Sequence, residues 1–171
     1  MLFYRVDMVI DPTIHVRRAE ARDAVPIDAL VRSLSADSIV GRFMGGVSRA
    51  SAIEELRREV RGDRAEFALI AENSRGTIIG QAYAAMLTPE DAEAAFVVRD
   101  REQHHGVGTA LLSAVVAELR ARGVRALHVD TAPGNVAMLA LLHQGKFPMR
   151  ERYINGSVHV TVQIDGGSPP S

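Results

Sequence analysis

The stretch Gln103-His104-His105-Gly106-Val107-Gly108-Thr109-Ala110 carries the strongest indication of the fold. An apolar run over 94–98 precedes it, and apolar residues recur at helical spacing after it, over 111–119. This order predicts a strand, a glycine loop and the N-terminus of a helix. First-turn amides lack acceptors within the helix, and the helix dipole adds positive charge there, so such a site suits a phosphate or pyrophosphate. Gly106 and Gly108 let the backbone approach a ligand closely, which favours an enzyme that uses a small cofactor.

Length and composition narrow the class of protein. A chain of 171 residues fits one domain, and a formal net charge of -1 gives no reason to expect nucleic acid or an anionic membrane as a partner. The absence of cysteine excludes disulfides, thiolate zinc sites and a cysteine nucleophile. No apolar run approaches the roughly 20 residues of a membrane span, and the N-terminus lacks a signal-peptide layout. We therefore expect a cytoplasmic protein with no metal.

The apolar patterns predict the remaining elements. Helices are expected over 22–33, 35–45, 51–61, 108–122 and 135–144, and strands over 14–20, 66–72, 77–87, 92–98, 125–130, 150–155 and 157–164. Gly62 and Gly123 end two of the helices, and Asn155-Gly156 predicts a hairpin between the last two strands. The predicted fold class is α/β, with a mixed central sheet and helices on both faces. Residues 1–13 form an N-terminal extension, and residues 165–171 form a disordered tail.

Over about residues 14 to 164, the chain resembles a GCN5-related N-acetyltransferase. The core motif of that family is Arg or Gln followed by x-x-G-x-G or A, and it stands here as Gln103 to Gly108. The resemblance implies a single catalytic domain over 14–164, with a mostly antiparallel sheet whose strands splay apart at the cofactor. Two departures are visible: Lys146 replaces a usual glycine, and Leu142 stands where many relatives carry a tyrosine that protonates the departing thiolate.

Within the family, three segments resemble the acetyltransferase domain of bacterial protein-lysine acetyltransferases. They are the serine-rich stretch 33–38 leading to Arg42-Phe43, the strand segment 92–99, and the helix start 135–139. This resemblance implies acetyl transfer to a protein lysine. It also implies that Arg42 and Phe43 belong to the acceptor-side wall, although an ordinary amphipathic helix with Phe43 in the core would show the same pattern.

The family resemblance implies acetyl-CoA as co-substrate, with its pyrophosphate on the loop amides. The loop residues expected to bind it are Gln103, His104, His105, Gly106, Val107, Gly108 and Thr109. The two histidine side chains could face either solvent or the phosphates. A glycine turn without a ligand is the structural alternative for this loop.

The strand before the loop and the last helix complete the expected cofactor site. In the family, backbone groups of that strand receive the pantetheine arm, and by position they belong to Phe96, Val97 and Val98. One N–H there would polarise the thioester carbonyl, while the valine side chains can still pack in the core. Asn135 resembles an asparagine that contacts CoA, and a helix N-cap explains it equally well.

Glu93 is the candidate general base, because an alkylammonium must lose a proton before its nitrogen can attack. It shares a strand face with Val97, although a carboxylate near a turn can also simply face solvent. Tyr153, His143 and solvent are candidates for the general acid. Asp91, Glu90 and Asp130 could form an acidic mouth for a cationic acceptor.

Three functions are consistent with these residues. The first is an acetyl-CoA-dependent N-acetyltransferase that acts on a primary amine, with protein lysine as the leading acceptor. The second is an acetyltransferase for a small amine, and the third is a catalytically silent domain that senses acetyl-CoA or binds a partner. The strand-rich C-terminus could pair across a homodimer.

Overall fold

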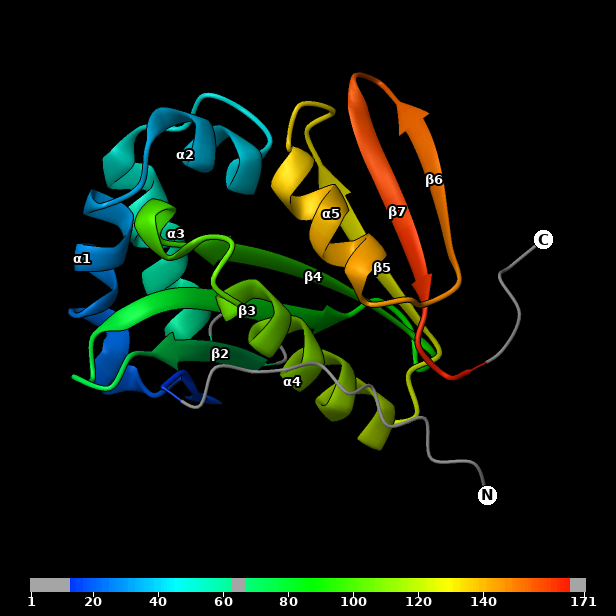
Figure 1. Cartoon of the computed structure of the whole chain (residues 1–171), viewed down its shortest axis with the longest axis horizontal. Helices are drawn as coiled ribbons and strands as arrows, with labels where there is room; N and C mark the ends of the chain where they lie inside the picture. Colours follow the sequence, from blue (N-terminus) through cyan, green and yellow to red (C-terminus); the bar gives the residue numbers. More distant parts are fainter. Residues whose placement is uncertain (1–12, 63–66, 167–171) are drawn as a thin grey trace.

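In the computed structural model of the chain, residues 13–62 and 67–166 are described. One sheet runs through this part in the order β1-β2-β3-β4-β5-β7-β6 (Figure 1). Its strands are β1 (His15–Arg18), β2 (Phe67–Glu72), β3 (Ile78–Met86), β4 (Asp91–Val98), β5 (Ala126–Thr131), β6 (Met149–Ile154) and β7 (Ser157–Gln163). Only β4 and β5 pair in parallel, so the predicted mixed, mostly antiparallel sheet is confirmed.

Helices cover both faces of this sheet, as predicted. They are α1 (Ile27–Arg32), α2 (Ala36–Phe43), α3 (Arg49–Arg61), α4 (Val107–Ala121) and α5 (Val136–Gln144), with short 3-10 turns η1 (Ala21–Ala24) and η2 (Asp100–Glu102). On one face, α4 and α5 pack against alternate strand residues such as Ala94 and Phe96. Helices α1 and α3 lie on the other face (Figure 1). They form a second core that includes Val97. Strand β4 therefore lies between two apolar layers.

The sequence prediction differs from the structure mainly near the N-terminus. The helix expected over 22–33 is divided into η1 and α1, with Pro26 at the N-cap of α1. Proline has no N–H to donate, so a continuous helical hydrogen-bond ladder cannot pass through it. Residues 1–12 of the expected extension, 167–171 of the expected tail, and Glu66 at the start of the expected second strand lie outside the described residues.

The C-terminal hairpin follows the prediction. Asn155 and Gly156 both have positive φ, 49° and 80°, as a type I′ turn requires between β6 and β7. This hairpin places β7 next to β5. Among the described residues, every helix is too short or too polar to cross a bilayer.

Candidate functional site

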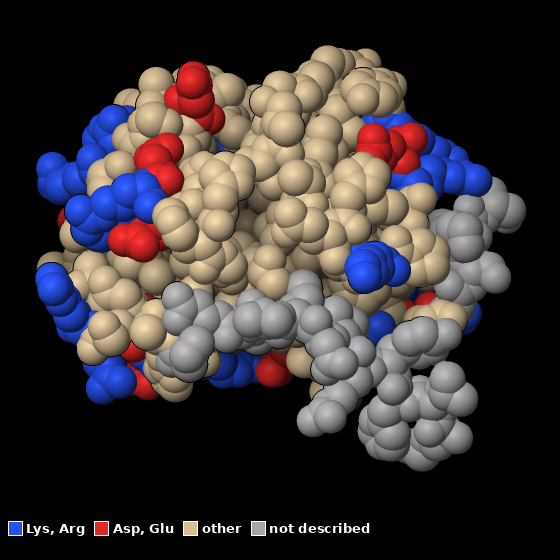
Figure 2. Space-filling view, in the orientation of Figure 1, with Lys and Arg blue, Asp and Glu red and all other residues tan. Residues whose placement is uncertain are grey.

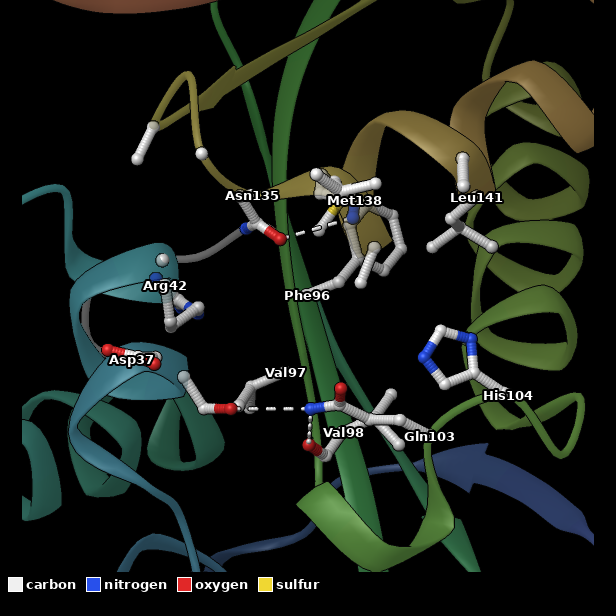
Figure 3. Close-up of a pocket in the computed structure, with 18 of the residues that line it drawn as sticks. Asp37, Arg42, Phe96, Val97, Val98, Gln103, His104, Asn135, Met138 and Leu141 are labelled. Carbon is white, nitrogen blue, oxygen red and sulfur yellow. Dashed lines mark hydrogen bonds between the residues drawn. The ribbon is translucent and has the colours of Figure 1, made fainter.

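A cleft of about 610 Å³ opens between α2 and α5 and reaches the end of β4 and the first turn of α4 (Figure 3). In the space-filling view the surface around this hollow is mostly uncharged (Figure 2). Its walls come from four regions: α2, the end of β4, the glycine loop and α5. The residues that line it include Gly41, Phe96, Val98, Gly108, Asn135 and Leu141.

The cleft exists because β4 and β5 pair over only three residues. Their last partners are Glu93 and His128, whereas β4 continues beside β3 as far as Val98, which pairs with Gly80. Beyond Glu93, the β5 side of β4 therefore lacks a neighbouring strand. This is the splayed strand pair expected at the cofactor site.

Alternation along β4 decides which backbone groups face this gap. The Arg99 N–H donates to the Ile79 carbonyl at 2.9 Å, so the backbone groups of Arg99 face β3. Because successive residues of an antiparallel strand direct their backbone groups to opposite sides, those of Val97 face β3. Those of Phe96 and Val98 face the gap. Of the three strand residues expected to bind the pantetheine arm, Phe96 and Val98 therefore offer backbone groups to the gap, and all three line the cleft.

The glycine loop forms the N-terminus of α4, as predicted. Gly106 is the N-cap residue, with φ 87°, and no side chain caps the helix. The first-turn amides of Val107, Gly108 and Thr109 therefore have no intrahelical acceptor. Val107 itself is buried in the core, and only its backbone is available. This arrangement is an anion site directed at one end of the cleft.

The two histidines of the loop have different positions. His104 has positive φ, 62°, and its ring lies beside the cleft (Figure 3). His105 is exposed and is not among the residues that line the cleft. Of the two histidines, only His104 therefore borders the cleft.

The side chain of Gln103 binds protein groups. Its Nε2 donates to the Val98 carbonyl at 3.2 Å and to Ser38 Oγ at 3.3 Å (dashed lines in Figure 3). Its backbone N–H donates to the Asp100 carbonyl at 3.2 Å. Gln103 thus covers one end of the free edge of β4, and it also lines the cleft.

Asn135 is the N-cap of α5, and it also lines the cleft. Its Oδ1 accepts from the Met138 N–H at 3.2 Å. The Nδ2 atom faces α2, since a Cβ added to Gly41 would lie 2.9 Å from it (Figure 3). The capping interpretation is confirmed, and the amide N–H₂ group stays beside the cleft.

Arg42 separates the main cleft from a second cleft of about 340 Å³ between α2, α3 and β3. Its guanidinium donates to both carboxylate oxygens of Glu59, at 2.6 and 2.9 Å, and its side chain is only 6% exposed. It also lies over the rings of Phe43 and Tyr83, 4.9 and 5.1 Å from their centroids. Burial raises the pKa of Tyr83, so its hydroxyl stays protonated at neutral pH. Arg42 and Phe43 both line the second cleft.

Glu93 lies on β4 on the same sheet face as Tyr83, whose strand partner is Ala95. It is partly buried and lines neither of the two clefts. Its position is at the point where β4 and β5 begin to separate.

Histidines are hydrogen-bonded to two of the three carboxylates expected to form an acidic mouth. Asp91 accepts from His128 Nε2 at 2.9 Å, and His159 Nδ1 lies 2.6 Å from Asp130. The hydrogen bond from His128, with a second from Thr88, lowers the pKa of Asp91. Asp91 and Asp130 are therefore already hydrogen-bonded, and they do not present a bare acidic surface.

Neither side chain predicted as general acid lines the cleft. Tyr153 lies on β6 and is 72% exposed, and His143 pairs with Glu151 at 2.9 Å. Sequence reasoning also missed residues that do line it, chiefly Gly41, Met138 and Leu141. Helical spacing from Asn135 would have placed the last two on one helix face, but no sequence pattern indicates that Gly41 faces Asn135. No group of three or more His, Asp or Glu suited to a metal occurs within 13–62 and 67–166.

Comparisons with known proteins agree with this geometry. The model of the acetyltransferase (GNAT) family matches residues 35–145. The GNAT domain of S. lividans PAT is similar in structure, with a TM-score of 0.75 and 24% identity, over 88% of this chain and 90% of that chain. None of the curated proteins compared with the chain matches it in sequence.

Two other similar structures were solved with a ligand. The acetyltransferase yncA of Salmonella typhimurium contains its cofactor acetyl-CoA; its TM-score is 0.62 and its identity 18%, over 93% of this chain and 98% of that chain. The paia N-acetyltransferase of Thermoplasma acidophilum contains coenzyme A; its TM-score is 0.70 and its identity 15%, over 88% of this chain and 98% of that chain. At these identities, the likenesses show the fold.

Proposed function

The chain belongs to the acetyltransferase (GNAT) family, and from that membership we propose that it transfers an acetyl group from acetyl-CoA to a primary amine, with a protein lysine as the leading acceptor. The observation that carries this proposal is the alignment of three features along one cleft. These are the free first-turn amides of α4, the unpaired edge of β4 after Glu93, and the N-terminus of α5 at Asn135. We propose residues 14–164 as the catalytic domain.

The groups along the cleft are of the kinds that acetyl-CoA binding requires. The amides of Val107, Gly108 and Thr109 can hold the pyrophosphate, because the helix terminus supplies N–H donors and positive potential. The backbone of Phe96 and the N–H of Val98 can bind the pantetheine arm as a neighbouring strand would, while the Val98 carbonyl already accepts from Gln103. The Nδ2 group of Asn135 is free to donate, since only its oxygen caps α5.

When bound, acetyl-CoA supplies the thioester whose acetyl group is transferred. The chain contributes polarisation through an N–H of Phe96 or Val98, which would donate to the carbonyl oxygen where negative charge develops. Glu93 accepts a proton from the ammonium, so that the amine nitrogen has a free electron pair for attack on the carbonyl carbon. We assign protonation of the departing thiolate to solvent, because neither Tyr153 nor His143 lines the cleft.

The acceptor side is proposed for the region around Arg42 and Phe43. Arg42 borders both clefts, so a chain that entered from the second cleft would pass it on the way to the acetyl end. The segments 33–43 and 92–99 resemble lysine acetyltransferase domains, and this resemblance supports a protein lysine as the acceptor. A cytoplasmic location and a homodimer stay predictions.

Two experiments test this proposal, a binding assay first and a turnover assay second. We expect acetyl-CoA and CoA, and not a nicotinamide dinucleotide, to raise the melting temperature, with a stabilisation of about 2.7 kcal/mol at a ligand concentration 100 times Kd. The next assay follows release of the CoA thiol with a lysine peptide, spermidine and a free amino acid as acceptors. Turnover of the lysine peptide alone supports a protein acceptor, whereas turnover of spermidine or the amino acid alone favours a small amine. Binding without transfer to any of them indicates a silent acetyl-CoA-binding domain.

A further inference from the structure

Asp100, in the turn between β4 and the glycine loop, accepts three hydrogen bonds from the start of α2. The Ser35 N–H donates to Oδ2 at 2.8 Å, and the hydroxyls of Ser35 and Ser38 donate to Oδ1 at 2.8 and 2.5 Å. Burial by itself would raise the pKa of Asp100, but the hydrogen bonds from Ser38 and Ser35 outweigh it and the pKa is lowered. The carboxylate is therefore ionised at neutral pH, where it is the strongest acceptor for these donors.

The same serine connects α2 to the cofactor loop. Ser38 Oγ donates to Asp100 and accepts from Gln103 Nε2, which also holds the Val98 carbonyl. A continuous polar path thus runs from α2 through Ser38 to the free end of β4 and to the residue that opens the loop. We call the set Ser35, Ser38, Asp100 and Gln103 the α2 strap.

The strap holds the first turn of helix α2, and other contacts hold the rest of the helix. Ile39 is buried, and Arg42 pairs with Glu59 of α3. Helix α2 also carries Gly41 and Arg42, which line the main cleft, and Phe43, which lines the second. The helix that borders both clefts is therefore attached by polar contacts to the loop at which the cofactor would bind.

We infer that Asp100 is a positioning residue that couples the cofactor loop to the acceptor-side helix α2. A ligand on the first-turn amides of α4 restrains the loop and Gln103, and the strap passes that restraint to Ser38 and the rest of α2. Binding at the loop then orders the wall around Arg42, and linkage requires that an acceptor held by that wall strengthens cofactor binding by the same factor. This inference rests on the proposed function, because it takes CoA as the ligand of the loop.

The test is hydrogen exchange of the α2 amides with and without saturating CoA, which needs no knowledge of the acceptor. In the wild-type chain we expect CoA to slow exchange over residues 39–44 by about five- to tenfold, the scale of a modest coupling. Asp100→Asn and Ser38→Ala should still bind CoA, with Kd changed by less than about threefold on the same scale, but CoA should no longer protect α2. Ser38→Thr, which keeps a hydroxyl, should restore the protection.

Glu102→Gln is the matched control, since Glu102 lies in the same turn and its ion pair is with Arg101, at 3.4 Å. It should behave as wild type. A kinetic comparison adds a second readout: Asp100→Asn should raise KM for a lysine peptide about five- to tenfold, with little change in the Kd of acetyl-CoA measured without the peptide. The inference is wrong, and the proposed function is unaffected, if CoA binds the wild type without protecting α2. The same holds if CoA protects α2 in Asp100→Asn and Ser38→Ala as strongly as in the wild type. Absence of CoA binding to the wild type overturns the proposed function as well.

Discussion

Glu93 on β4 and His128 on β5 are the last partners of the parallel strand pair, and beyond them the two strands separate. The candidate base therefore lies at the vertex of the gap that receives the thioester in our proposal. It is also adjacent in register to a histidine that is held by Asp91 at 2.9 Å and stacked on His159. The position of Glu93 is thus determined by strand pairing and does not depend on a mobile loop.

Replacing Glu93 by glutamine tests its role as the base. Glu93→Gln keeps the shape of the side chain but cannot accept a proton, so kcat should fall by about 10²- to 10⁴-fold. Binding of acetyl-CoA, measured by calorimetry, should not change. Glu90→Gln is the control, because Glu90 is exposed in the turn before β4. An unchanged kcat and pH–rate profile in Glu93→Gln would remove Glu93 from the mechanism.

The left-handed N-cap of α4 can be tested separately from the stability of the helix. A Cβ at Gly106 would meet only Ile14 Cδ1, at 4.0 Å, so Gly106→Ala acts through φ 87° and the loop conformation. We expect a loss of about 1–2 kcal/mol in unfolding free energy and weaker acetyl-CoA binding, on the order of tenfold or 1.4 kcal/mol.

Gly123 provides the matched control for that variant. It has φ 83° just beyond the opposite end of α4, and nothing lies within 4 Å of an added Cβ. Gly123→Ala should lower the unfolding free energy by a similar amount and leave acetyl-CoA binding intact. Equal loss of binding in both variants would show that helix stability, not loop geometry, governs the affinity.

The buried pair Arg42–Glu59 predicts a large loss of stability in a single variant. Arg42→Met would leave the Glu59 carboxylate, only 3% exposed, with Gln81 as its remaining donor, at 2.8 Å. The cost should be about 3–5 kcal/mol in denaturant unfolding. Arg42→Met combined with Glu59→Leu should recover much of it, because no buried charge remains. A double variant as unstable as the sum of both single variants would contradict this account.

Asp23 should make stability depend on pH below neutrality. Its hydrogen bonds with Arg17, both at 2.9 Å, and one from the Glu20 N–H lower its pKa although burial opposes them. A lowered pKa means that the stabilisation is complete above the unfolded-state value of about 3.9 and is lost as pH falls through the folded-state value.

Asp23→Asn should therefore reduce the unfolding free energy by about 2 kcal/mol at pH 7. The difference in unfolding free energy between wild type and variant should shrink as pH falls below about 4. Denaturant titrations at pH 7, 5, 4 and 3 measure this difference. Arg17→Met removes the same bonds from the other partner and should abolish the same pH-dependent component. A difference in unfolding free energy that stays constant over this pH range would show that Asp23 does not cause the pH dependence.

Local patterns determined most elements and the anion-binding loop, because these depend on neighbours in the chain. Apolar alternation predicts β4, and glycines at 106 and 108 between a strand and a helix predict the free amides of α4. The N-cap at Asn135 and the hairpin at Asn155-Gly156 are local in the same sense, since each needs only a side-chain oxygen or a positive φ nearby. Pro26 shows where such patterns fail. The apolar residues keep helical spacing on both sides of it, but the helical hydrogen bonds do not continue past it.

Tertiary structure alone decided how these elements share one cleft. The end of β4–β5 pairing at Glu93 and His128 depends on how two strands separated by a helix are aligned, and no local signal encodes that. Ser38, Asp100 and Gln103 join through contacts 62 and 65 residues apart in the chain. Gly41 faces Asn135 only because the fold places α2 and α5 on opposite sides of the cleft. A sequence pattern records the neighbours of a residue along the chain, whereas burial, pairing and partner choice arise when distant segments compete for the same space.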